Sequence, residues 1–186
     1  DSSAALASYG RAAELRPDFA EAHCNLADAL ARRKLYGDAV PAYRRAIALR
    51  PDLVGAQLNL GNALYAAHRF PEAQAAFEAT LAVKPDLFEA QINLGNALYA
   101  QQQYEKAAAA FDVALGLKPG DPDAHANLGN ALFMLERLDE ALANYSQALA
   151  AVPDHPAALG MCTYLRRQTC DWTDIARDET RLMEHI

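Results

Sequence analysis

Carboxamide side chains recur along this chain at a fixed spacing. Residues 59–64 read NLGNAL, the same six letters return at 93–98 and 127–132, and a variant, NLADAL, occupies 25–30. Each copy begins 34 residues after the one before it. A carboxamide carries a carbonyl acceptor and an NH2 donor in one plane, which matches the C=O and N–H of an extended peptide backbone. A ladder of such amides could hold a polypeptide main chain with little regard for its sequence.

Residue patterns typical of catalysis or metal binding are not found. The chain contains no GxxxxGK, GxGxxG or GxSxG, which are patterns of phosphate-binding loops and of nucleophilic serines. Cys24, Cys162 and Cys170 show no CxxC spacing, and His23 and His125 lie three repeats apart. We therefore expect no catalytic site, no metal ion and no cofactor. The cysteine usage favours a reducing, cytoplasmic setting.

Charge and hydropathy narrow the class of partner. The 186 residues carry a net charge of −7, and the only basic run is Arg32-Arg33-Lys34, so nucleic-acid binding is not expected. No apolar run approaches the ~18 residues of a membrane span, and no signal peptide opens the chain. The chain starts with Asp1 rather than Met and stops within a helix-like stretch, which suggests a fragment of a longer protein.

Two apolar-periodic segments of about 13 residues fill each period and predict a pair of helices. A proline marks each period, at Pro17, Pro51, Pro85, Pro119 and Pro153. With this proline counted as position 32, the full repeats are 20–53, 54–87, 88–121 and 122–155, after a half repeat at 1–19. Pro71, Asp121-Pro122 and His155-Pro156 are typical of helix starts.

Small and large residues alternate between the two predicted helices. Position 8 is alanine or glycine, and position 24 is tyrosine or phenylalanine, so that the small residue allows close approach and the ring fills the gap between neighbouring pairs. In length, helix pair and small–large pattern, the chain resembles the tetratricopeptide repeat (TPR) family, over four whole repeats and the preceding half. The resemblance implies an all-α fold: a single domain, 1–186, forming a right-handed α-solenoid whose first helices line a concave groove.

In the resembled family the amides would face this groove, which implies a protein or peptide partner. The expected peptide-binding residues, at positions 6, 9 and 12, are Asn25, Asn59, Asn62, Asn93, Asn96, Asn127, Asn130, Tyr65, Tyr99 and Phe133. At position 12 the first repeat has Ala31 instead of an aromatic residue. Position 5, which includes Leu58 and Ala126, is expected beside the amides and offers no basic clamp for a terminal carboxylate, unlike chaperone-tail receptors. The alternative is that the asparagines bond between repeats and the rings merely pack.

After Pro153 the repeat pattern fails, and residues 156–186 are expected to form degenerate capping helices with Trp172 as the plug. The segment 165–174, LRRQTCDWTD, resembles the junction in bacterial relatives of O-linked N-acetylglucosamine transferases. There, such repeats precede a nucleotide-sugar-dependent glycosyltransferase domain, so the resemblance implies a substrate-recruiting arm. That domain is absent here, and no catalytic residue can be carried over. The alternatives to this arm are a free-standing scaffold for a multiprotein assembly and an enzyme in its own right. Because exposed solenoid faces often self-associate, a homo-oligomer is a further expectation about partners.

Overall fold

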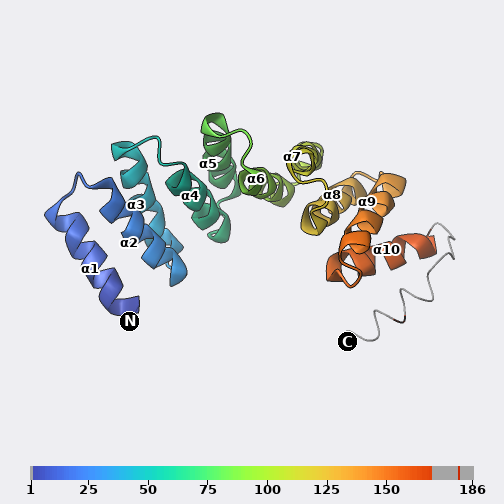
Figure 1. The fold of residues 1–186 in the computed structure, drawn as a ribbon, viewed down its shortest axis with the longest axis horizontal. Coiled ribbons are helices and arrows are strands. Elements are labelled where there is room, and N and C mark those ends of the chain that lie inside the picture. Colours follow the sequence, from blue (N-terminus) through green and yellow to red (C-terminus); the bar gives the residue numbers. More distant parts are fainter. Residues whose placement is uncertain (1, 169–179, 181–186) are drawn as a thin grey trace. The chain divides into compact units, whose positions relative to one another are not determined.

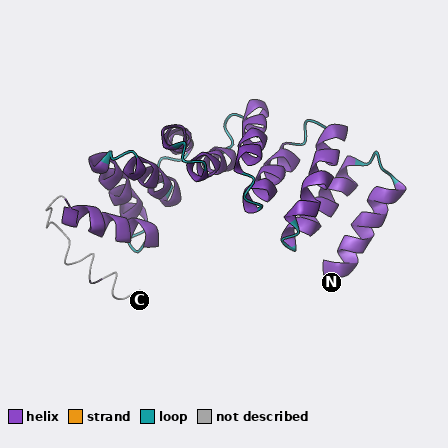
Figure 2. Ribbon diagram, turned by 180° about the vertical axis from the view of Figure 1, so that it is seen from behind, coloured by secondary structure: helices purple, strands orange, loops and turns teal. Residues whose placement is uncertain are grey.

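The described part of the chain is built from helices joined by short loops (Figure 2). The computed structural model describes residues 2–168 and residue 180, and within them there are ten α-helices and no strand. The helices are α1 Ser2–Leu15, α2 Ala20–Arg32, α3 Tyr36–Leu49, α4 Val54–Ala66, α5 Phe70–Val83, α6 Phe88–Ala100, α7 Tyr104–Leu117, α8 Pro122–Met134, α9 Leu138–Ala151 and α10 Pro156–Gln168. The predicted all-α class is therefore confirmed. Trp172, the predicted plug, lies outside the described residues.

Helix starts follow the residues that favour them. Pro71 occupies the first turn of α5, where its missing N–H has no helical partner to lose. Asp121 accepts a hydrogen bond from the N–H of Ala124 at 2.9 Å and so caps α8, which begins at Pro122. These starts were predicted from the sequence, as was the start of α10 at Pro156.

The chain divides into two compact units, of which the first spans Asp1–Gln101 and the second begins at Gln102. In the first unit each helix from α1 to α6 packs on the next, and α2 and α4 also contact α4 and α6 respectively (Figure 1). In the second unit α7 to α10 pack in the same sequential manner, with α8 also against α10. Sequential stacking of helix pairs is how solenoids bury their core, and the predicted solenoid packing is confirmed.

Glycine and aromatic residues meet where the two helices of a pair cross. A Cβ added to Gly61 would lie 2.4 Å from Cε1 of Phe77, and one added to Gly129 would lie 2.7 Å from Cε1 of Tyr145. Both rings are fully buried. Each ring therefore lies against the glycine of its own pair, and Phe77 also reaches the boundary with the next pair, where it lines a small pocket with Asn93.

A residue in the left-handed conformation follows the first helix of all four pairs. Lys34, His68, Gln102 and Glu136 have φ between 58° and 61°. At the first of these turns, the N–H of Lys34 donates to the carbonyl of Ala31 at 2.8 Å, and the N–H of Leu35 donates to that of Leu30 at 3.0 Å. This pair of bonds is the Schellman motif, which glycine usually completes. Because none of the four residues is glycine, the sequence carried no signal for the turn.

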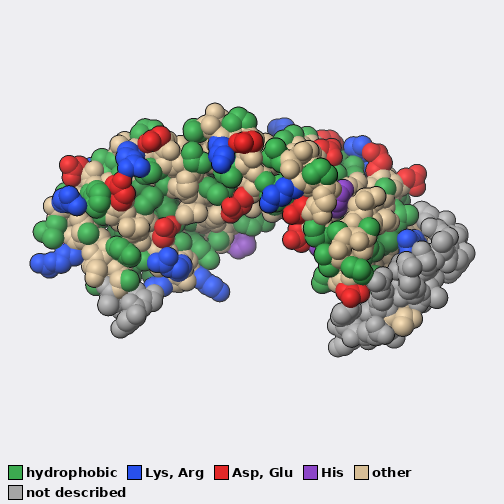
Figure 3. All heavy atoms as spheres, viewed as in Figure 1, with side chains coloured by type: hydrophobic (Ala, Val, Ile, Leu, Met, Phe, Trp, Pro, Cys, Tyr) green, Lys and Arg blue, Asp and Glu red, His purple; other side chains and the backbone are tan. Residues whose placement is uncertain are grey.

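Charges of both signs are interspersed on the surface, as the visible face of the first unit shows (Figure 3). Arg44 and Arg69 both donate to the carboxylate of Glu72, at 2.6 and 2.7 Å, and Arg137 pairs in the same way with Glu140. Between residues 2 and 168, none of the helices combines the length and the apolar character that crossing a membrane requires.

Candidate functional site

The amides of the first unit are joined across successive helix pairs. Asn59 on α4 donates an Nδ2–H to Oδ1 of Asp28 on α2 at 3.1 Å. Asn93 on α6 donates in the same way to Oδ1 of Asn62 on α4 at 2.8 Å. Each bond runs from position 6 of one repeat to position 9 of the repeat before it. The stacking of first helices on one another thus sets the amides in a row and gives each a defined orientation.

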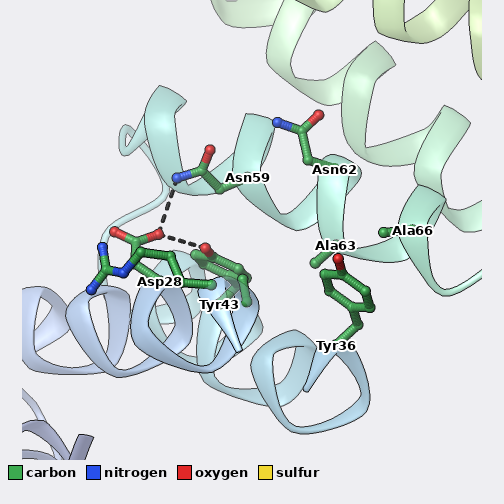
Figure 4. A pocket seen from close by; sticks show the side chains of 9 residues that line it. Asp28, Tyr36, Tyr43, Asn59, Asn62, Ala63 and Ala66 are labelled. Carbon is green, nitrogen blue, oxygen red and sulfur yellow. Dashed lines mark hydrogen bonds between the residues drawn. The ribbon is translucent and has the colours of Figure 1, made fainter. Parts of the chain in front are cut away.

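Where position 24 is tyrosine, its hydroxyl donates to the side chain at position 9 of the same repeat. The hydroxyl of Tyr43 donates to Oδ1 of Asp28 at 2.5 Å, and that of Tyr145 donates to Oδ1 of Asn130 at 2.8 Å. Oδ1 of Asp28 therefore accepts from both Tyr43 and Asn59, which point toward it in Figure 4. Burial and then the bond to Asp28 raise the pKa of Tyr43, so its hydroxyl remains a donor at neutral pH.

These bonds use only part of each amide. A carboxamide has two N–H donors and a carbonyl oxygen with two lone pairs. The bond from Asn59 engages one N–H, and Asn62 accepts through its oxygen, which leaves the donors of its NH2 group to other partners. The side chains of Asn59, Asn62, Asn93 and Asn96 are half-buried, so solvent and ligands can reach them. Bonding between repeats and binding of a peptide are therefore chemically compatible.

Two pockets occupy equivalent places in successive repeats of the first unit. The larger has a volume of about 500 Å³ and lies between α2, α3 and α4 (Figure 4). Its lining includes Asp28, Ala31, Tyr36, Tyr43, Asn59 and Asn62. The smaller has a volume of about 100 Å³ and is lined by Asn62, Tyr65, Phe77, Asn93 and Asn96. The two share repeat positions 6, 9, 12 and 24.

The other predicted residues are less closely grouped. Asn25 on α2 is exposed, and Tyr99 on α6 is half-buried. Asn127, Asn130 and Phe133 lie on α8 in the second unit, where the Phe133 ring centroid is 6.1 Å from that of Tyr164. The structure thus brings the amides and Tyr65 of the first unit together, and it places the same sequence pattern on one helix of the second.

The expectation for position 5 was wrong at two repeats. Leu58 is 8% exposed and Ala126 is 2% exposed, so both belong to the core rather than to a groove surface. The physical reason is that each first helix packs on more than its own partner. In the first unit, α4 contacts α2, α3, α5 and α6, and these neighbours cover a wider stripe of the helix than an amphipathic pattern implies.

Histidine and glutamine at position 4 serve the loops between pairs. The ring Nε2 of His23 lies 3.2 Å from the carbonyl of Pro17, and that of His125 lies 2.9 Å from the carbonyl of Pro119. Gln57 donates to the carbonyl of Pro51 at 2.8 Å. Each side chain reaches the proline six residues earlier. This common bond gives the repeated position a structural role.

In the part of the chain that the structure describes, no cluster suited to a metal ion is found, and Cys24 is not activated as a nucleophile. Residues 2–168 and 180 hold no group of three His, Cys, Asp or Glu side chains arranged around a common metal position. Burial raises the pKa of the Cys24 thiol, and the carboxylates of Asp28 and Glu21 raise it further. Cys24 is therefore held as a thiol at neutral pH, and the thiol is a poor nucleophile.

Sequence reasoning named Asn59 and Asn62 but missed the other seven residues that line the larger pocket. Asp28, Ala31 and Tyr36 were not among the expected peptide-binding residues, although they line the larger pocket. For Asp28 and Ala31 the signal was the difference between repeats, because the first repeat alone has aspartate at position 9 and alanine at position 12.

Comparisons with protein families cover nearly all of the described chain. Family models described as tetratricopeptide repeat match residues 58–122 and 98–165, and a model described as TPR repeat matches residues 2–34 and 28–67. These matches overlap and run from residue 2 to residue 165. No curated protein matches the chain.

Several solved structures share the fold. MamA (41-end) from Desulfovibrio magneticus RS-1 is 21% identical, with a TM-score of 0.82 over 89% of this chain and 93% of its own. YrrB, described as a TPR protein with an unusual peptide-binding site, is 21% identical, with a TM-score of 0.77 over 95% and 91%. PilF of Pseudomonas aeruginosa is 20% identical, with a TM-score of 0.81 over 98% and 83%. The repeated helix pairs, the family matches and this shared fold together place the chain in the tetratricopeptide repeat family, to which it belongs.

Proposed function

We propose that this chain binds an extended polypeptide along the row of amides on α2, α4 and α6. The observation that carries the proposal is the bond from Asn93 to Asn62, together with its equivalent from Asn59 to Asp28. Each bond fixes an amide plane while the side chain stays half-buried. An amide that is already oriented loses less rotamer entropy when a ligand binds, and this lowers the cost of binding.

The amides supply both halves of a backbone hydrogen bond. The NH2 group of Asn62 would donate to a peptide carbonyl, and the carbonyl oxygens of Asn59 and Asn93 would accept from peptide N–H groups. Successive residues of an extended chain rise by about 3.3 Å, so a strand laid across the helices offers many such groups. Tyr65, whose side chain is exposed, would pack against side chains of the bound strand.

The proposal is supported by the fold, which is shared with YrrB, a TPR protein whose description mentions a peptide-binding site. In the second unit, α8 carries the equivalent side chains Asn127, Asn130 and Phe133, which would offer peptide contacts of their own. Cytoplasmic localisation and the absence of catalysis remain predictions from the sequence.

We also propose that the chain serves as the substrate-recruiting arm of a glycosyltransferase-like protein. The support is the resemblance of 165–174 to a junction segment, most of which lies outside the described residues. The gene sequence downstream of the codon for Ile186 tests this context: a nucleotide-sugar-binding domain encoded there would agree with it. A stop codon soon after Ile186 would instead favour the free-standing scaffold.

The substitution Asn62→Asp tests the amide row without breaking the contact between repeats. Asp28 shows that an aspartate at this position accepts the bond from the next repeat, so Asn93 keeps its partner while the NH2 donors are lost. The matched control is Ala75→Glu, which adds the same charge on an exposed position of α5.

The probe is a 12-residue peptide selected on the wild-type chain from a random peptide library displayed on phage. We expect Asn62→Asp to weaken its binding about tenfold, the equivalent of about 1.4 kcal/mol and close to one lost hydrogen bond. The control should bind as the wild type does. Equal affinities for all three chains would refute the amide row and favour binding by another face, as in the scaffold alternative.

A further inference from the structure

We propose that the pocket between α2, α3 and α4 receives an aromatic side chain of the bound polypeptide, tyrosine or tryptophan, as its anchor. The inference rests on the proposed function and adds a preference to it: a main chain held by amides, with one side chain selected by shape. It follows from position 12, which is Ala31 in the first repeat and Tyr65 in the second.

The first step is the difference between two equivalent pockets. At position 12 the first repeat has Ala31, and the second has Tyr65. The space beside Ala31 has a volume of about 500 Å³, whereas the equivalent space beside Tyr65 has about 100 Å³. The other shared positions differ little in size between the two sites. The larger pocket therefore includes the space that an aromatic ring at position 12 would otherwise occupy, and it extends further, to Arg32, Tyr36 and Ala66.

The second step concerns the ring of Tyr36, whose repeat has Ala31 rather than an aromatic residue at position 12. In the second repeat, Tyr65 lies edge-on to Phe70, with ring centroids 5.3 Å apart and an interplanar angle of 60°. The equivalent of Phe70 is Tyr36, which lines the larger pocket and is only half-buried. In Figure 4 Tyr36 stands beside Ala63 at one side of the pocket. A ring supplied by the ligand would pack against Tyr36 as Tyr65 packs against Phe70.

The third step concerns the polar groups around the apolar floor. Ala31, Ala63 and Ala66 form small apolar parts of the lining, and Asp28 and Asn62 add oxygen acceptors. Oδ1 of Asp28 already accepts two bonds, but a carboxylate offers about four acceptor sites in total. A phenol O–H or an indole N–H could use the remaining sites, which favours tyrosine and tryptophan over phenylalanine.

A cationic side chain fits this pocket less well. Both Arg32 and Asp28 line the pocket. The positive charge of Arg32 offsets the attraction of the Asp28 carboxylate for a lysine or arginine side chain. An aliphatic side chain would fill less of the volume and would offer no donor to the remaining acceptor sites of Asp28 and Asn62.

The test uses net-neutral ten-residue peptides of Ser, Thr and Ala with one guest residue: Ala, Leu, Lys, Tyr or Trp. Affinities are measured by NMR titration of the wild-type chain and of Ala31→Tyr, which gives the first repeat the tyrosine of the second. We expect the Tyr and Trp guests to bind wild type at least about tenfold more tightly than the Ala guest. In Ala31→Tyr the ratio should fall below about twofold.

The possible results separate the two proposals. If every guest binds the wild type equally, if Lys ranks first, or if Ala31→Tyr keeps the aromatic preference, the anchor pocket is refuted and the amide row stands. If no peptide binds at all, the proposed function fails and the anchor fails with it. Should Ala31→Tyr not fold, Tyr36→Ala replaces it: loss of the stacking ring should reduce the aromatic preference, and an undiminished preference would refute the anchor.

Discussion

Asn93 donates an Nδ2–H to Oδ1 of Asn62, one repeat earlier, at 2.8 Å. Asn59 makes the equivalent bond to Asp28. Asparagine is a poor residue for a helix interior, and these bonds give one reason for its recurrence at positions 6 and 9. The same side chains join helix pairs and keep donors and acceptors for a ligand, so their substitution has consequences for both stability and binding.

The contribution of the Asn93–Asn62 bond to stability can be isolated. We expect Asn93→Ala to lower the free energy of unfolding by about 1 kcal/mol, the usual net value of one hydrogen bond. A double-mutant cycle with Asn62→Ala, measured by urea denaturation, should give a coupling energy of about 0.5–1.5 kcal/mol. Strictly additive effects would show that the bond contributes nothing.

Two glycines of the second unit should respond to alanine in opposite directions. A Cβ at Gly129 would meet the buried ring of Tyr145, whereas one at Gly160 on α10 would have no heavy atom of the described residues within 4 Å. Overpacking costs about 1–3 kcal/mol and alanine gains about 1 kcal/mol of helix propensity. Gly129→Ala should therefore be destabilised by about 1 kcal/mol and Gly160→Ala stabilised by a similar amount. Melting temperatures that move in the same direction would contradict this packing.

A glycine at one of the left-handed turns should increase the stability of the folded chain. His68 has a φ of 58° and is exposed, and an L-residue in this region costs about 1–2 kcal/mol. Glycine at this position removes the strain, but it loses more conformational entropy on folding, so only part of the strain energy is recovered. His68→Gly should therefore raise the free energy of unfolding by about 0.5–1 kcal/mol. Ala67→Gly, at the preceding residue with a φ of −85°, is the control and should lower it.

The stability of the first unit should depend on pH in the acid range because of Glu72. Hydrogen bonds from Arg69 and then Arg44 lower the pKa of Glu72 in the folded chain. As the pH falls, the unfolded chain is protonated first, so the stabilisation is present above the unfolded pKa and is lost as the pH falls through the folded one. The difference in melting temperature between wild type and Glu72→Gln should therefore shrink below about pH 4, and also in high salt. A difference that stays constant with pH would count against this ion-pair cluster.

Much of the fold could be predicted from the sequence, because the pattern of one helix pair recurs in four successive repeats of 34 residues. Pro71 and Pro122 marked helix starts, and Gly61 marked the close approach of an aromatic ring. The turn at His68 could not be predicted, since its left-handed backbone is imposed by the two flanking helices rather than by a glycine.

The site was predictable in its residue types and not in its bonds. The asparagines were identified, but which of them bond to each other depends on the stagger between successive first helices, which no single repeat encodes. The burial of Leu58 depends on the same stacking. The larger pocket depends on the small side chain of Ala31, because the equivalent space in the next repeat is lined by the ring of Tyr65 and is smaller.

The most direct test of the central claim is to observe the side-chain NH2 signals of asparagine in 15N–1H NMR spectra during peptide titration. If the amides hold the main chain, the signals of Asn59, Asn62, Asn93 and Asn96 should shift in proportion to bound peptide, while signals of exposed residues on α3 and α5 stay in place. Saturable binding that leaves these four NH2 signals unmoved would contradict the claim.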